Sequence, residues 1–203
     1  MGKRRVWLVP LLATWLGTGR ADPAGELIDA ARRQIGVTLQ YDGGYRLLAF
    51  PGGDVPADRG VCTDVLIRAY RVAFGRDLQV LVNRDMSRAF SAYPRLWGLR
   101  RPDRNIDHRR VPNLAAFFRR HGQTLGASAR ADDYAAGDLV TWRLPGGVPH
   151  IGIVGDRRGV GRPAVIHNIG QGAREEDSLF AFPVTGHYRY LPPWRPAGES
   201  SGD

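Results

Sequence analysis

The fold is decided by the segment Gly60-Val61-Cys62-Thr63-Asp64-Val65-Leu66-Ile67-Arg68-Ala69-Tyr70, which holds the only cysteine of the chain. Apolar residues recur here at spacings of three and four, which predicts an amphipathic helix: Val61, Val65, Ala69, Val72 and Ala73. A glycine-containing turn precedes the helix, so we expect Cys62 at or beside its first turn. Free N–H groups and the helix dipole favour a thiolate there. Taken alone, however, this segment favours a simpler role for Cys62, that of a small buried apolar side chain.

A secretory signal peptide is predicted over residues 1–21. A positive run at residues 1–5 precedes a mostly apolar stretch at 6–16, and Gly19 and Ala21 are small residues of the kind that a signal peptidase reads. The apolar stretch is shorter than the about 20 residues that a membrane-spanning helix needs. We therefore expect cleavage after Ala21 and a periplasmic or secreted protein without stable membrane insertion. An uncleaved anchor is the alternative.

Composition predicts one domain over residues 22–192 and a disordered tail over 193–203. Of the 203 residues, 43% are hydrophobic and 24% charged, which suffices for one core. The formal net charge is +9. The basic residues are mostly arginines scattered along the chain, whereas a nucleic-acid partner would favour a basic stripe with interleaved aromatic residues. We expect no nucleic-acid partner, and such a surface suits an anionic environment such as a cell-wall polymer or an outer-membrane surface.

The hydrophobic period changes along the chain from helical to extended. Helices are predicted over residues 23–36, 78–90 and 112–121, the helix that carries Cys62 is predicted to end near Gly75, and strands are predicted over 138–143, 150–154, 164–169 and 186–191. Helices first and strands second predict an α+β domain with an antiparallel sheet. The N-terminal helices, including the one that carries the cysteine at its N-terminus, are expected to pack on this sheet.

Two histidines on consecutive predicted strands are candidates to act with Cys62. A thiol that attacks a carbonyl needs a base, and the base needs a third group to orient it. If the two strands pair symmetrically about their loop, Val154 faces Val165, and His150 and His167 share one face. They are then diagonal neighbours with Cα atoms roughly 7–8 Å apart. A slip of one residue would separate them onto opposite faces.

We therefore predict Cys62 as the nucleophile, His150 as the general base and acid, and His167 as the group that orients His150. Asn168 is the alternative orienting group, although strand alternation sends it to the opposite face. A single cysteine in an oxidising compartment cannot form an internal disulfide, which favours a crosslinking or reactive thiol.

No metal or cofactor is expected. Asp103, Asp107 and His108 fit no standard pattern of ligand spacing, so we expect them to form a salt-bridged loop. The acidic run at residues 175–177 is expected to be a solvated loop, with binding of a cationic amine of a peptide stem as the alternative.

The order of these motifs resembles the NlpC/p60 branch of the papain-like cysteine peptidases. The motifs are the cysteine at a helix start, then Gly137-Asp138-Leu139-Val140, then His150-Ile151-Gly152-Ile153-Val154, then Val165-Ile166-His167. Segments such as Gly186-His187-Tyr188-Arg189-Tyr190 are more similar to a bacterial family catalogued as domain of unknown function 1287. This resemblance extends over nearly all of the mature chain. The wider resemblance implies a papain-like fold, hydrolysis of peptide stems in the bacterial cell wall, and a Cys/His/polar triad on Cys62, His150 and His167.

Two features depart from the NlpC-type pattern. Those enzymes usually have Asp-Cys-Ser-Gly, whereas this chain places Asp64 in the glycine position. Their oxyanion-assisting tyrosine usually lies closer to the cysteine than Tyr41 does, so Tyr41 and Tyr45 are both candidates. The predicted function is an exported cysteine hydrolase that cleaves amide bonds in peptidoglycan stems. A non-catalytic wall- or partner-binding module, and an acyl transferase or thioesterase, are the alternatives.

Overall fold

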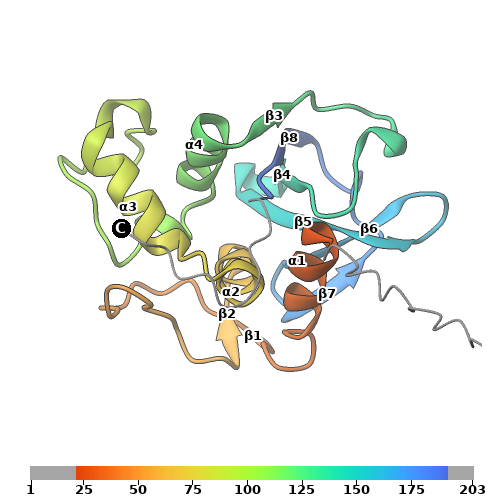
Figure 1. The fold of residues 1–203 in the computed structure, drawn as a ribbon, viewed down its shortest axis with the longest axis horizontal. Helices are drawn as coiled ribbons and strands as arrows, with labels where there is room; N and C mark the ends of the chain where they lie inside the picture. The colour runs from red at the N-terminus through yellow and green to blue at the C-terminus, as the bar shows by residue number, and fades with distance from the viewer. Residues whose placement is uncertain (1–21, 192–203) are drawn as a thin grey trace, which may run out of the picture.

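Helices come first and an antiparallel sheet second, as the sequence predicted (Figure 1). The computed structural model describes residues 22–191, so the predicted signal peptide and the tail over residues 193–203 lie outside the described residues. The α+β class is confirmed. Within residues 22–191, every helix is too short or too polar to span a bilayer.

Four α-helices occur in the described part of the chain: α1 (Pro23–Arg32), α2 (Cys62–Phe74), α3 (Leu78–Arg88) and α4 (Val111–His121). Helix α1 begins because the Asp22 side chain accepts hydrogen bonds from the backbone N–H groups of Ala24 and Gly25. It ends at Arg32, earlier than the predicted end at Gly36. Helices α1, α2 and α4 contact the sheet, and α3 lies further out against α2 and α4 (Figure 1).

Helix α2 begins at Cys62, as predicted. Val61 is extended, and its backbone N–H donates to a carboxylate oxygen of Asp64 at 2.7 Å, which satisfies a group that the helix leaves free. Gly75 ends the helix in the left-handed conformation, with φ at 61°, which glycine adopts without strain. Val72, predicted for the buried stripe, is 61% exposed. The buried stripe instead includes Val65, Leu66, Ala69 and Tyr70.

The main sheet has the strand order β3-β8-β4-β5-β6-β7, with neighbouring strands antiparallel. Its strands are β3 (Gln123–Leu125), β4 (Leu139–Arg143), β5 (Pro149–Arg158), β6 (Pro163–Asn168), β7 (Ala173–Glu176) and β8 (Val184–Arg189). The short strands β1 (Gln40–Tyr41) and β2 (Arg59–Gly60) form a separate parallel pair before α2. The four predicted strands are present, and the two edge strands β3 and β7 were not predicted.

Each face of the sheet carries its own apolar layer, because side chains alternate along a strand. Leu139, Ile151, Ile153 and Ile166 lie in the same core cluster as residues of α1, α2 and α4. The opposite layer contains Val140, Trp142, Val154 and Val165, together with Tyr134 and Leu179. The indole N–H of Trp142 donates to the carbonyl of Leu179 at 2.9 Å, which holds the chain after β7 over this second face.

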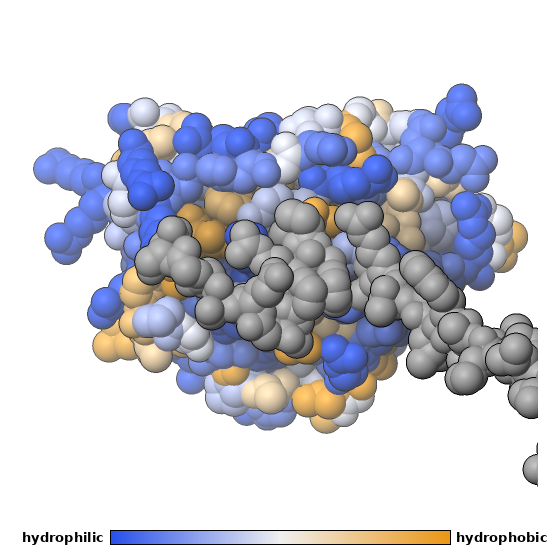
Figure 2. Space-filling view, viewed as in Figure 1, coloured by the Kyte–Doolittle hydropathy of each residue, from blue (hydrophilic) through white to orange (hydrophobic). Residues whose placement is uncertain are grey.

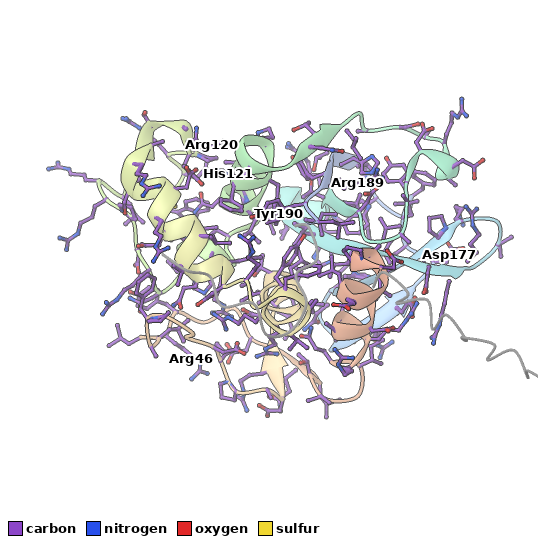
Figure 3. The ribbon with its side chains drawn as sticks, in the orientation of Figure 1. Arg46, Arg120, His121, Asp177, Arg189 and Tyr190 are labelled. Carbon is purple, nitrogen blue, oxygen red and sulfur yellow. The ribbon has the colours of Figure 1, made fainter. Side chains whose placement is uncertain are left out.

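Helix α3 is held to α4 by a polar cluster around Asp85. Arg120 and His121 lie between α3 and α4 (Figure 3) and contact the Asp85 carboxylate at 2.6 Å and 3.0 Å. The Tyr93 hydroxyl donates to the same carboxylate at 2.6 Å. These bonds hold the pKa of Asp85 well below its usual range, and the bond from Arg120 has the largest effect.

The viewed surface is mainly hydrophilic. Figure 2 shows blue side chains spread over the described part of this face, with apolar side chains in small separate groups. Apolar groups of this size are ordinary on a protein surface and indicate no interface by themselves.

Candidate active site

The two predicted histidines meet on one face of the sheet. Strands β5 and β6 pair in the predicted register, with Val154 opposite Val165. Nε2 of His150 lies 2.9 Å from Nδ1 of His167, and the ring centroids are 5.1 Å apart. Both side chains are buried. The predicted contact between the two imidazoles is therefore confirmed.

The imidazole of His150 is packed against Trp142, its cross-strand neighbour on β4, with ring centroids 5.6 Å apart. Gly152 makes this packing possible, because a Cβ atom there would lie 2.7 Å from Cγ1 of Val165 and 3.1 Å from the Trp142 ring. Burial, and then the charge of His167, lower the pKa of His150 to about 3. At neutral pH the ring is therefore uncharged.

The second ring nitrogen of His167 faces polar groups from β7 and the residues after it. Nε2 of His167 lies 3.1 Å from the Ser178 hydroxyl and 3.4 Å from Oε2 of Glu176. Burial lowers the pKa of His167, and the charge of Glu176 opposes this effect. A cavity of about 160 Å³, lined in part by His167, Arg174 and Glu176, opens beside the contact.

The predicted solvated loop at residues 175–177 is wrong for its first two residues, which lie in β7. The Glu175 carboxylate is buried and accepts two hydrogen bonds from Arg32, at 2.6 Å and 2.8 Å. Glu176 faces His167. Sequence reasoning could not find this position of Glu176, because β7 reads Ala-Arg-Glu-Glu and lacks the alternation that marks a half-buried strand.

The sulfur of Cys62 is buried on the helix-covered side of β5. Cys62 is 3% exposed and lies in the same core cluster as Ile151 and Ile166. Burial raises the pKa of Cys62 to about 12, the backbone N–H of Ile151 lowers it in part, and the charge of Asp64 raises it. Burial thus favours the thiol at neutral pH, against the thiolate that the helix start predicts.

The sulfur lies close to the chain that carries His150 without bonding to either imidazole. The Ile151 amide that interacts with the sulfur belongs to the residue after His150. The Ile151 side chain points toward the helices, whereas the His150 ring points toward Trp142. Among residues 22–191, no hydrogen bond joins the sulfur to His150 or His167. The structure thus brings the two histidines together and places the sulfur at the neighbouring backbone.

Of the two tyrosine candidates, Tyr41 is the one near the sulfur. On β1, Tyr41 is the strand partner of Gly60 on β2, and Gly60 lies two positions before Cys62. Burial, and then the charges of Cys62 and Asp64, raise the pKa of Tyr41 to about 12.

The hydroxyl of Tyr45 bonds elsewhere. It donates to Asp103 at 3.1 Å and accepts from the Asn105 amide at 3.0 Å. The structure therefore places Tyr41 near Cys62 and holds the Tyr45 hydroxyl at Asp103 and Asn105.

Asp64 and Asn168 both support the chain that leads to Cys62. Asp64 accepts from Nε and Nη2 of Arg109, each at 2.9 Å, and both side chains are buried. The Asn168 amide donates to the carbonyl of Gly60 at 3.1 Å. It therefore faces away from His167, as strand alternation predicted.

The described residues offer no cluster of three His, Cys, Asp or Glu side chains placed to hold a metal ion. Asp107 instead forms an ion pair with Arg110 at 2.9 Å, and the Asp103 carboxylate accepts from the Asn105 backbone N–H at 2.9 Å. The predicted salt-bridged loop is therefore confirmed for Asp107 alone, because Asp103 makes hydrogen bonds only and His108 is buried with no partner for its Nδ1 among the described residues.

Comparisons with known proteins identify relatives of this chain. The family described as "Domain of unknown function (DUF1287)" matches residues 28–190. Over 166 residues, 81% of this chain and 80% of the relative, the chain is 56% identical to "Uncharacterized protein YijF" of Escherichia coli (strain K12). A solved structure of NlpC1 from Trichomonas vaginalis is similar with a TM-score of 0.44 and 18% identity. That match covers 84% of this chain and 45% of the solved chain, so this chain spans less than half of its length.

Proposed function

This chain belongs to the DUF1287 family, and from its site we propose that it is an exported cysteine hydrolase that cleaves amide bonds in peptidoglycan peptide stems. The observation that carries the proposal is the 2.9 Å contact of His150 with His167, beside the backbone amide that faces the only cysteine. A thiol with a base and a third group that orients the base is what acyl transfer to sulfur needs. The order of motifs shared with NlpC/p60 peptidases supports the substrate class, and the predicted signal peptide supports export.

In the proposed reaction, the Cys62 sulfur attacks the amide carbon and its proton passes to Nδ1 of His150. The carbonyl oxygen becomes an oxyanion that the backbone N–H of Cys62 and the Tyr41 hydroxyl stabilise. The C–N bond then breaks, His150 returns the proton to the leaving amine, and a thioester remains. Water that gives a proton to His150 attacks the thioester, which releases the carboxylic acid and restores the thiol. Loss of one oxyanion donor is expected to cost about 3–4 kcal/mol of transition-state stabilisation.

The raised pKa of Cys62 decides how the first step proceeds. A thiol with a pKa of about 12 and an imidazole with a pKa of about 3 do not exchange a proton at rest. Proton transfer therefore accompanies attack on the carbonyl, and the sulfur and the ring have to approach each other at the start of β5 when substrate binds. Catalytic hydrogen bonds are often long in ligand-free enzymes and tighten in the substrate complex.

The test is digestion of purified peptidoglycan, with the released muropeptides measured by mass spectrometry. We expect the wild type to release fragments, and Cys62→Ser and His150→Ala to release none. His121→Gln is the control, because it removes an imidazole at the far end of α4 that contacts Asp85 rather than the site. A folded wild type that releases nothing contradicts the proposal.

The two alternatives give other outcomes in the same experiment. A binding module sediments with peptidoglycan without releasing fragments, and Cys62→Ser binds equally well. An acyl transferase or thioesterase forms a thioester on Cys62 with an activated acyl donor, depends on His150, and leaves the muropeptides unchanged.

A further inference from the structure

We propose that Glu176 is a positioning residue that fixes the tautomers of both histidines, an inference that rests on the proposed function. Oε2 of Glu176 lies 3.4 Å from Nε2 of His167, and Nδ1 of His167 lies 2.9 Å from Nε2 of His150. A chain of polar contacts therefore runs from β7 through β6 to β5. It ends at Nδ1 of His150, the nitrogen that would receive the proton of Cys62.

The direction of the hydrogen bonds follows from the chemistry of a carboxylate. An ionised carboxylate only accepts hydrogen bonds, so a neutral His167 that bonds to it carries its proton on Nε2. Nδ1 of His167 then accepts from His150, which must carry its own proton on Nε2. Nδ1 of His150 is left with a free lone pair. The opposite tautomer of His167 would put a proton on Nδ1 of His150 and block its action as a base.

Ser178 cannot make this choice, although its hydroxyl lies 3.1 Å from the same nitrogen. A hydroxyl both donates and accepts, so it is compatible with either tautomer of His167. Of the two groups that contact Nε2, only the Glu176 carboxylate distinguishes the tautomers.

The register of β6 and β7 places Glu176 for this role. Val165 pairs with Glu176 and His167 pairs with Arg174, so the three polar side chains share one face of the sheet. Arg174 lies 3.6 Å from the other carboxylate oxygen, Oε1 of Glu176. The ion pair therefore orients the carboxylate and leaves Oε2 for the imidazole.

The test is Glu176→Gln, which keeps the shape of the side chain and adds an amide donor. The ring protonation of His150 and His167 is measured by ¹⁵N NMR, with signals assigned from single histidine-to-glutamine variants. We expect both wild-type rings to carry their proton on Nε2, and the variant to show a larger population protonated on Nδ1. In peptidoglycan digestion we expect kcat to fall about tenfold or more with KM unchanged, by analogy with the outer partners that orient metal-binding histidines.

Two further variants separate this role from a general structural one. Asp177→Asn removes a neighbouring carboxylate, which pairs with Arg162 at 3.1 Å, and Ser178→Ala removes the hydroxyl. We expect both variants to keep the wild-type tautomers.

The inference is overturned if wild-type His167 carries its proton on Nδ1, or if Glu176→Gln changes neither the ring spectra nor kcat. Its failure is distinct from failure of the proposed function. The tautomers are measured without substrate, whereas the hydrolase proposal is decided by Cys62→Ser in the digestion.

Discussion

At the scale of single residues, two opposing effects act on the sulfur of Cys62. Groups at a helix N-terminus stabilise a negative charge by about 0.3–1 kcal/mol where they are exposed. Transfer of a thiolate into an apolar core costs more than this, and the buried Asp64 adds a like charge nearby. The effect of burial on the pKa of Cys62 is therefore larger than the opposite effect of the helix N-terminus.

This balance predicts slow alkylation of Cys62 by iodoacetamide. The pKa is about 12 in the folded protein against an ordinary value of 9.0. Allowing for the greater nucleophilicity of a more basic thiolate, we expect the folded protein at pH 7 to react roughly fiftyfold or more slowly than the urea-unfolded protein. The rate of the folded protein should keep rising through pH 10, while that of the unfolded protein levels off near pH 9.

The rates are measured by mass spectrometry, and the unfolded chain is the internal control because it carries the same single cysteine. Fast, pH-independent alkylation of the folded protein between pH 5 and pH 8 would contradict the expectation. It would show a resting thiolate–imidazolium pair.

The sequence predicted the part of the site that depends on a strict period. Side chains two apart share a face of a strand, so the contact of His150 with His167 followed from the register alone. Glu176 and the Ile151 amide could not be predicted in this way. The first lies on a short polar strand without alternation, and the second is a backbone group whose role depends on how α2 packs against β5.

At the scale of elements, the start of α2 depends on the buried pair of Asp64 and Arg109. Arg109 comes from the segment before α4 and also donates to the carbonyls of Asp42 and Gly44, at 2.9 Å and 3.2 Å. The pair thereby joins three segments that are distant in sequence around the first turn of the cysteine helix. Periodicity and local motifs do not reveal a contact between residues so far apart in the sequence. The sequence therefore suggested no structural partner for Asp64.

We expect Arg109→Met to destabilise the protein by about 3–5 kcal/mol, because it leaves the Asp64 carboxylate buried without its cation. Urea unfolding gives the free energy. The double variant Asp64→Asn/Arg109→Met should be destabilised by less than the sum of the two single variants, since the single variants each leave a buried partner unpaired. Strict additivity of the two changes would show that the pair contributes no coupling.

Element boundaries show the same limit of prediction. The start of α2 at Cys62 and its end before Gly75 followed from local signals in the turn and the glycine. Local signals did not predict the strands β3 and β7, because edge strands can be short and polar when a neighbouring strand supplies their hydrogen bonds.

At the scale of the whole molecule, several histidines are buried in the neutral form. His108 is 2% exposed and its Nδ1 has no hydrogen-bond partner among the described residues. Burial, and then the charges of Arg71 and Arg109, lower its pKa to about 4. Burial also lowers the pKa of His150, to about 3. Folding therefore holds these rings neutral at pH values where the unfolded chain binds protons.

The sign of the pH dependence follows from these shifts. Between pH 6.5, the ordinary value, and about pH 4 the unfolded state binds more protons at His108 than the folded state. The stability that this ring contributes is fully present above pH 6.5 and is lost as the pH falls toward 4. From pH 7 to pH 5 the loss for one such ring is on the order of 2 kcal/mol. We expect the urea midpoint to fall accordingly, and to fall less in His108→Gln, which cannot ionise. Equal decreases in the wild type and the variant would show that His108 takes up no proton on unfolding, and that its ring is not held neutral by the fold.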